Sequence, residues 1–170
     1  QLQGTSFEQS QVISCSSISR TGESELITAL KAHAQRMQQR SDSGHFRMAI
    51  DRTFSVKGAG TVVTGAILAG QIGLSETLSA PNQSQPFKVR GLHRQNVVSV
   101  SAGAGDRAAL NLTGPQAALS DLTRGDWLTA NPKMSARSHC DLMLHTLPAE
   151  KKSIRHWTSV HVHHAAQHTL

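Results

Sequence analysis

Residues 51–65, DRTFSVKGAGTVVTG, decide the fold that we expect for this chain. Two runs rich in β-branched residues flank a Gly-Ala-Gly turn at 58–60, and glycine readily takes the positive φ that tight hairpin turns need. The stretch therefore predicts a β-hairpin, in which Gly65 allows a bulge or a close backbone approach. A charged pair, Asp51 and Arg52, stands inside the first strand, where an alternating pattern alone does not explain it.

Short strand candidates continue on both sides of this hairpin. Apolar residues alternate through FRMAID, and further candidates lie at 61–69, 87–93, 107–112 and 121–128. Gly, Asn and Pro separate them, and short strands at such spacing are typical of a sandwich or a closed barrel. The fold class expected is therefore mainly β.

One helix is predicted before the strands, at residues 23–40. Leu26, Ile27, Leu30, Ala34 and Met37 recur at helical spacing on one face. Gly22 is an acceptable N-cap, and basic residues gather toward the C-terminal end, where the helix dipole favours them. The stretch SDSG at 41–44 has the composition of a linker.

The last 40 or so residues differ from the rest in being interrupted by Pro132 and rich in histidine. HCDLMLHTL at 139–147 and SVHVHHAAQH at 159–168 are strand candidates. A stretch this short rarely buries a core alone, so we expect the start of a second β-domain. The chain reads as a piece of a longer protein, with domains expected at 1–43, 44–132 and 133–170.

Composition narrows the classes of partner. The chain has 170 residues, 17 Lys+Arg and 11 Asp+Glu, a net charge of +6 that suits an RNA partner without requiring one. Tyr is absent and aromatic residues make up 4%, which disfavours a surface that stacks single-stranded bases. Cys15 and Cys140 show no paired spacing and are expected to be buried small hydrophobes. A signal peptide and a membrane span are not evident, so a cytoplasmic protein is expected.

Several motifs together resemble a known family. IDRTFSVKGAGTVVTGAILAGQI at 50–72, VRGLHRQN at 89–96, AGDRAALNL at 104–112 and RGDWL at 124–128 resemble domain II of EF-Tu-type translation GTPases. Ile50-Asp51-Arg52, GLHRQN and HVHHAAQH at 161–168 resemble the selenocysteine-specific branch, SelB. The resemblance implies a domain II β-barrel, preceded by a helical remnant of the GTPase domain and followed by a partial second barrel. It also implies a fragment of a factor that binds selenocysteinyl-tRNA and delivers it to the ribosome with GTP.

The resemblance assigns a charged cradle for the selenocysteinyl group to Asp51, Arg52 and Arg107. A selenol is more acidic than a hydroxyl, and guanidinium groups favour an anion because arginine keeps its proton. His93 and Arg94 could meet the terminal adenosine or a phosphate. The alternatives are an exposed Asp51–Arg52 ion pair of little energetic value, and a solvated loop for His93 and Arg94.

A second, weaker resemblance concerns the nucleotide. Ser14, Cys15 and Ser16 in VISCSS match the last guanine-contacting loop of these GTPases, with Cys where Ala is usual. GTP and Mg²⁺ are the cofactors of the full-length family. The chain has neither GxxxxGK[ST] nor Asn-Lys-x-Asp, so GTP hydrolysis and a bound cofactor are not expected of it. Ser75-Glu76 replaces the usual Gly-Asp, and Ala49 stands where Pro is common.

Other functions remain open at this point. The runner-up is a general EF-Tu-like aminoacyl-tRNA module without a selenocysteine preference. His161 and His163 share a strand face, with His156, His164 and His168 near in sequence, but no carboxylate accompanies them, so a His-rich metal protein is less favoured and no metal site is expected. A selenoprotein mRNA hairpin would bind only through a region that this chain lacks, and no membrane partner is expected.

Overall fold

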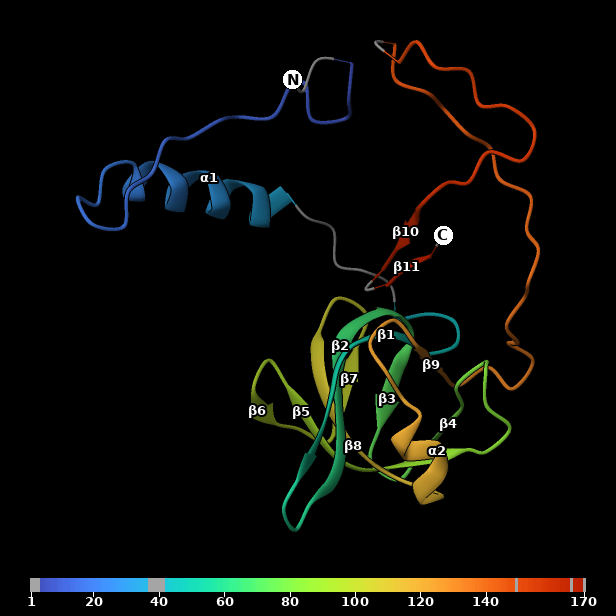
Figure 1. Cartoon of the computed structure of the whole chain (residues 1–170). Helices are drawn as coiled ribbons and strands as arrows, with labels where there is room; N and C mark the ends of the chain where they lie inside the picture. Colours follow the sequence, from blue (N-terminus) through green and yellow to red (C-terminus); the bar gives the residue numbers. More distant parts are fainter. Residues whose placement is uncertain (1–3, 37–41, 149, 166, 170) are drawn as a thin grey trace. The chain divides into compact units, whose positions relative to one another are not determined.

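The computed structural model describes residues 4–36, 42–148, 150–165 and 167–169 (Figure 1). The chain divides into two units, Gln1–Gln39 with Cys140–Thr158 and Arg40–His139 with Ser159–Leu170. The domain limits expected from the sequence stay a prediction. The end of the expected helix, with Met37 and Arg40, and Ser41 of the expected linker lie outside the described residues.

A closed β-barrel forms the larger unit. Its strands follow the order β4-β5-β8-β2-β1-β9, and neighbours are antiparallel. Their bounds are β1 Arg47–Val56, β2 Gly60–Ala69, β4 Thr77–Leu78, β5 Phe87–Arg94, β8 Arg107–Thr113 and β9 Trp127–Thr129. The path closes where the backbones of Ser79 and Thr129 exchange two hydrogen bonds of 2.9 Å each. The mainly β fold class is confirmed.

Shorter elements complete this unit. β6 (Val97–Val98) pairs with the end of β5, while β3 (Gln71–Gly73) and β7 (Ser101–Gly103) pair with each other. α2 (Gln116–Ser120) follows β8. The sequence analysis missed these elements because strands of two or three residues and a helix of five are too short to show a period.

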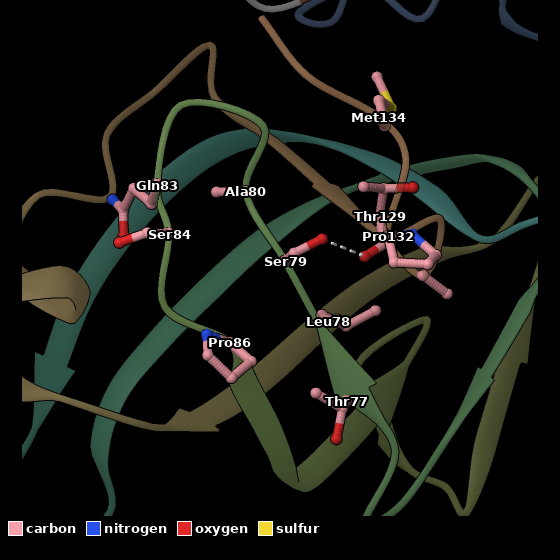
Figure 2. A pocket seen from close by; sticks show the side chains of 11 residues that line it. Thr77, Leu78, Ser79, Ala80, Gln83, Ser84, Pro86, Thr129, Pro132 and Met134 are labelled. Carbon is pink, nitrogen blue, oxygen red and sulfur yellow. Dashed lines mark hydrogen bonds between the residues drawn. The ribbon is translucent and has the colours of Figure 1, made fainter.

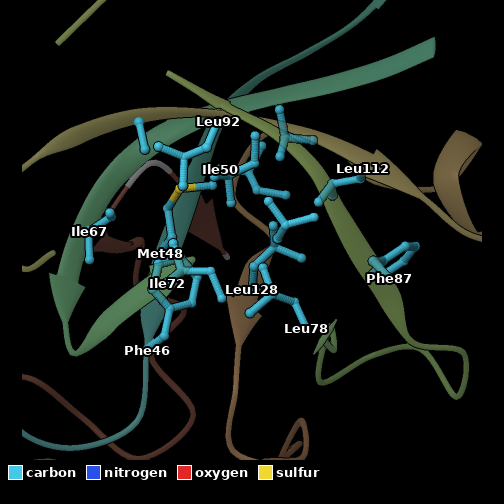
Figure 3. Close-up of a cluster of buried hydrophobic side chains, with 14 of the residues drawn as sticks. Phe46, Met48, Ile50, Ile67, Ile72, Leu78, Phe87, Leu92, Leu112 and Leu128 are labelled. Carbon is cyan, nitrogen blue, oxygen red and sulfur yellow. The ribbon is translucent and has the colours of Figure 1, made fainter. Parts of the chain in front are cut away.

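Buried side chains from every barrel strand fill the interior. Figure 3 shows Met48 and Ile50 from β1, Ile67 from β2 and Leu112 from β8 turned toward one another. All four are at most 1% exposed. Since successive strand residues point to opposite faces, this inward set leaves alternate residues on the outer surface of the barrel.

The β1–β2 hairpin has the geometry that its glycines predicted. Gly58 and Gly60 in the turn have φ values of 82° and 89°. At Gly65, an added Cβ would lie 2.1 Å from the Ala49 carbonyl oxygen. No side chain fits there, so Gly65 lets β1 and β2 approach closely beside the charged pair.

The smaller unit contains α1 (Glu23–Arg36) and buries none of its helical side chains. The helix starts where the Leu26 amide donates to the Gly22 carbonyl at 2.9 Å, in keeping with the expected N-cap. Cys15 and Cys140 are both exposed, so the prediction that they are buried was wrong. A free cysteine needs a core to be buried in, and the described residues of this unit include no buried hydrophobic side chain.

The C-terminal strand predictions were partly wrong. Residues 139–147 form no strand and are exposed, because they have no partner strand among the described residues. Residues 159–168 do not form one long strand: β10 (Val162–His164) turns back onto β11 (Gln167–Thr169), with Ala165 at a φ of 47°. Neither described helix is both long and apolar enough to cross a bilayer.

Candidate functional site

A β-bulge places Asp51. In the β1–β2 register Ile50 faces Gly65 and Arg52 faces Thr64, which leaves Asp51 as an extra residue without a partner. A bulge of this kind bends the strand and redirects a side chain. Thr64 Oγ1 then donates a hydrogen bond of 2.6 Å to Asp51 Oδ1. The charged pair singled out in the sequence is therefore built around a local break in the ladder.

Arg107, the first residue of β8, completes the arrangement from the other side of β2. It faces Ala66 in the register. Its Nη1 donates to Asp51 Oδ2 and its Nη2 donates to Asp51 Oδ1 at 3.0 Å, a two-pronged pairing of the guanidinium with the carboxylate. Arg107 Nη2 also lies 3.5 Å from Thr64 Oγ1. Such planar pairing fixes orientation as well as adding energy.

The pair is partly exposed, with 27% of the Asp51 side chain and 52% of the Arg107 side chain open to solvent. Burial by itself raises the pKa of Asp51, but hydrogen bonds from Arg107 and Thr64, and the charges of Arg107 and Arg52, outweigh it and hold that pKa below 3.8. The hydrogen bond to Asp51 raises the pKa of Arg107. The Asp51–Arg107 pair is therefore fully ionised at neutral pH.

Arg52 adds the second guanidinium. Its side chain is exposed and lies opposite Thr64 in the register, and its charge acts on Asp51. Among the described residues it makes no hydrogen bond or ion pair. Asp51 offsets the charge of Arg107, so the three groups together carry one net positive charge, supplied by Arg52.

A surface depression of about 360 Å³ opens beside Arg107. It is lined by Thr64, Gln95, Asn96, Arg107, Ala108 and Ala109. Gln95 and Asn96 form the turn after β5, both with positive φ, 49° and 69°. The Gln95 amide donates to the Arg107 carbonyl at 3.0 Å, which ties this turn to the start of β8. Non-glycine residues with positive φ often mark functional sites.

His93 and Arg94 lie on β5, next to β8. His93 faces Ala109 in the register and is exposed. Arg94 Nη1 is 4.0 Å from Asp106 Oδ2, a loose exposed pair. The structure thus places both on the strand beside Arg107, but neither hydrogen-bonds to Asp51 or Arg107 within the described part of the chain.

The sequence analysis missed Thr64, Gln95 and Asn96. Thr64 could have been found from the sequence. In TVVTG it alternates with the buried Val63, so its side chain points outward, and pairing this strand with β1 places it opposite the charged residues. Gln95 and Asn96 entered the sequence analysis only as part of the GLHRQN resemblance, because their positive φ is visible only in the folded turn.

The predicted nucleotide loop lies in the smaller unit. The Ser16 amide donates to the Thr21 carbonyl at 3.0 Å, and the Cys15 thiol donates to the Gly22 carbonyl at 3.7 Å. Ser16 Oγ accepts from the Ser19 amide at 3.2 Å. The loop is thus closed on itself, and the assignment of Ser14, Cys15 and Ser16 to a nucleotide stays a prediction.

Two of the described C-terminal histidines, His156 and His164, lie against tryptophans. The His164 ring stacks on Trp127 with centroids 6.5 Å apart and planes 10° apart. His156 meets Trp157 edge-on at 4.9 Å. Within the described ranges no three His, Cys, Asp or Glu residues are grouped as metal ligands would be.

A second depression, of about 630 Å³, lies where the barrel closes (Figure 2). Its lining includes Leu78, Ser79, Thr129 and Pro132, and the Ser79 hydroxyl donates to the Thr129 carbonyl at 3.4 Å. It has no ionisable side chain in its lining, so it offers no acid–base or charge chemistry comparable with that around Arg107.

No family model matches this chain. The selenocysteine-specific elongation factor of Escherichia coli K12 is 39% identical over 146 residues, which is 84% of this chain and 23% of that protein. The one from Desulfomicrobium baculatum is 30% identical over 169 residues, 99% of this chain and 26% of that protein. The chain therefore spans about a quarter of the length of these curated relatives.

Solved structures agree with the sequence matches. The apo structure of translation elongation factor SelB from Methanococcus maripaludis superposes with a TM-score of 0.67 and 30% identity, over 76% of this chain and 28% of that one. A bacterial selenocysteine-specific elongation factor, EF-Sec, gives a TM-score of 0.58 and 25% identity, over 65% of this chain and 19% of that one.

Proposed function

This chain is a SelB-like segment, homologous over most of its length to selenocysteine-specific elongation factors, and on that premise we propose that its barrel holds the aminoacyl end of selenocysteinyl-tRNA. The observation that carries the proposal is the group of Asp51, Thr64 and Arg107, with Arg52 beside it making no ion pair to any described residue. Arg107 and Thr64 both line the 360 Å³ depression, which is large enough for a small side chain with its ester linkage.

Charge is the proposed basis of selection. The selenol group ionises at neutral pH and the serine hydroxyl does not, so only the former gains from a nearby cation. Two unit charges 4 Å apart interact by about 1 kcal/mol in water and about 4 kcal/mol near a protein surface. The exposure of this site favours the lower part of that range. A preference of about tenfold needs about 1.4 kcal/mol, which is within reach.

The geometry refines the roles that the sequence suggested. Asp51 already compensates Arg107, so we assign to Arg107 the donation of oriented N–H groups rather than a free charge. Arg52 supplies the uncompensated charge. His93 and Arg94, on the adjacent strand, are proposed to approach the terminal nucleotide or its phosphate, a contact that would position the tRNA without reading sequence.

The test compares binding of selenocysteinyl-tRNA and seryl-tRNA to the 170-residue chain at one salt concentration. Arg52→Gln should weaken binding of selenocysteinyl-tRNA about tenfold, the loss of about 1.4 kcal/mol, and leave seryl-tRNA nearly unchanged. Arg47→Gln is the matched control, since Arg47 is an exposed arginine at the far end of the same strand. Equal losses for both tRNAs in Arg52→Gln would reject selection by charge.

A general aminoacyl-tRNA module remains the second candidate. The observation that favours it is the internal neutralisation of Arg107 by Asp51, because a polar depression with little net charge accepts many small aminoacyl groups. That function predicts equal affinity for selenocysteinyl-tRNA and seryl-tRNA in the unaltered chain.

Delivery of the tRNA to the ribosome with GTP is proposed for a longer protein that contains this segment. The sequence of this chain has no phosphate loop, so its residues do not fit the phosphates of a guanine nucleotide or their Mg²⁺. The nucleotide would be held by another part of such a protein. An mRNA hairpin would likewise need a further region.

A further inference from the structure

We propose that Thr64 is a positioning residue, whose hydroxyl fixes the Asp51 carboxylate and, through it, the direction of the Arg107 guanidinium. The consequence for ligand selection rests on the function proposed above. The positioning itself concerns the unliganded chain and can be tested without any ligand.

The first reason lies in the backbone around Asp51. As the extra residue of the bulge, Asp51 has no register partner on β2. Its carboxylate is held instead by side chains, at 2.6 Å from Thr64 Oγ1 and 3.0 Å from Arg107 Nη2. Thr64 lies directly opposite the bulge, but its pairing with β8 is regular from Val63 to Gly65, so β8 holds Thr64 in place beside the extra residue.

The second reason is the hydroxyl itself. A threonine hydroxyl has one proton to donate and two lone pairs that accept. Here the proton goes to Asp51, and Arg107 Nη2 approaches the same oxygen at 3.5 Å, so three side chains from β1, β2 and β8 close a triangle. Threonine is stiff about χ1, which makes it a good fixed point for the other two.

The third reason is the position of the triangle. Thr64 and Arg107 line the 360 Å³ depression, whereas Asp51 does not. A ligand would therefore meet the arginine and the hydroxyl, with the carboxylate behind them. If Thr64 lost its hydroxyl, Asp51 and Arg107 would still pair, but the pair could swing about the bulge. The N–H groups offered to the depression would then lose their fixed direction.

The first experiment follows the Asp51 carboxyl carbon by NMR during a pH titration of the 170-residue chain. Thr64→Val removes a donor to the carboxylate, so the midpoint of Asp51 should move upward; Thr64→Ser keeps the donor and should leave it in place. Arg107 and Arg52, the charged groups acting on Asp51, are intact in both variants. An unchanged midpoint in Thr64→Val would overturn the proposal.

Thr53→Val is the control for removing a threonine hydroxyl from this hairpin. Thr53 Oγ1 is buried and has no hydrogen-bond partner among the described residues, so its loss should leave the Asp51 midpoint unchanged. Valine suits a strand as well as threonine does, and circular dichroism would verify the fold of each variant. An equal shift in Thr53→Val would mark a general effect of the substitution and would also overturn the proposal.

The second experiment measures the affinity ratio between selenocysteinyl-tRNA and seryl-tRNA. Because Thr64 fixes the direction of the Arg107 N–H groups, Thr64→Val should lower the ratio, by no more than the preference of about tenfold itself, while Thr64→Ser retains it. A shifted Asp51 midpoint with an unchanged ratio would overturn the link to selection. If the unaltered chain shows no preference at all, the proposed function fails, and the titration still decides whether Thr64 positions Asp51.

Discussion

The barrel and the unit that contains α1 obey the same sequence rules, yet only one of them buries its apolar side chains. In the barrel, Met48, Val63 and Leu110 are fully enclosed. On α1, Leu26, Ile27 and Leu30 have exposures of 38%, 43% and 59%. The helical face was predicted from its periodicity, as was the alternating run that contains Met48, while Val63 and Leu110 lie in the strand candidates at 61–69 and 107–112. Periodicity identifies the apolar face of an element, but burial of that face needs other elements packed against it. In the barrel, the long-range pairing of strands provides them.

Substitutions in the core of the barrel should lower the free energy of unfolding more than substitutions on α1. Leu110→Ala removes a fully buried side chain and should lower the free energy of unfolding by about 2–5 kcal/mol. Leu30→Ala on α1 should change it by less than about 0.5 kcal/mol, because that side chain is already exposed. Urea denaturation followed through Trp127 fluorescence measures both; comparable losses would show that α1 is buried in solution.

Two glycines allow a sharper contrast, since an added Cβ would lie 2.1 Å from a carbonyl oxygen in each case: that of Ala49 for Gly65 and that of Ser14 for Gly22. Gly65→Ala should cost about 1–3 kcal/mol of barrel stability, as overpacking in a core does. Gly22→Ala should leave the barrel midpoint unchanged and make the loop at 16–21 more sensitive to protease. If Gly22→Ala lowered the urea denaturation midpoint of the barrel, the two units would unfold together.

The ion pairs of the two units should differ in pH dependence. The pKa of Asp51 is lower in the folded chain than its ordinary value of 3.8, so its stabilising effect is present above that value and is lost as pH falls through the folded pKa. Asp51→Asn should cost about 0.5–1 kcal/mol at pH 7 and nothing in strong acid.

Glu23→Gln serves as the counterpart, because its pairing with Arg20 is longer, at 4.0 Å, and more exposed. It should have no measurable effect at any pH. Denaturation midpoints at a series of pH values compare the two variants, and a pH-independent loss in Asp51→Asn would contradict the role of its charge.

The smallest expected effect on the stability of the barrel is an increase, from a substitution at Ser75. Ser75 has a φ of 67° in the turn between β3 and β4, where the resemblance led us to expect glycine. Ser75→Gly should raise the barrel stability by about 0.5 kcal/mol, the relief of strain less the added chain entropy. Arg20, at a φ of 58° in the other unit, offers the matched change. If Arg20→Gly shifted the barrel midpoint as much, the turn would not be the cause.

The sequence was sufficient for those elements whose local pattern and long-range partners agree. The hairpin around Gly58 and Gly60 and the strands β5 and β8 carry a turn residue or an alternating pattern and find partner strands in the barrel, whereas α1 forms from its local pattern alone. Residues 139–147 have the same alternation and form no strand, because no edge pairs with them in the described structure. Alternation is therefore necessary for these strands but does not specify them.

For the site, the sequence identified the charged groups and missed what holds them. Asp51 and Arg107 were assigned together through a family resemblance, and the structure joins them directly. The bulge at Asp51 depends on the register between strands, which a single strand pattern does not contain, and the role of Thr64 follows only once β2 is paired with β1. Neutralisation of the Arg107 charge by Asp51 is likewise a property of the fold. It leaves Arg52 as the group that supplies the net positive charge of the site.

The pH dependence of binding tests the central claim, selection by charge, most directly. Asp51 stays ionised well below neutrality because its pKa is held under 3.8, so the Asp51–Arg107 pair keeps its charge while a selenol gains its proton. A His93→Gln background removes the nearby imidazole from the comparison. The ratio of affinities for selenocysteinyl-tRNA and seryl-tRNA should fall toward one as pH is lowered through the selenol pKa. A preference that persists unchanged once the selenol is protonated would contradict selection by charge.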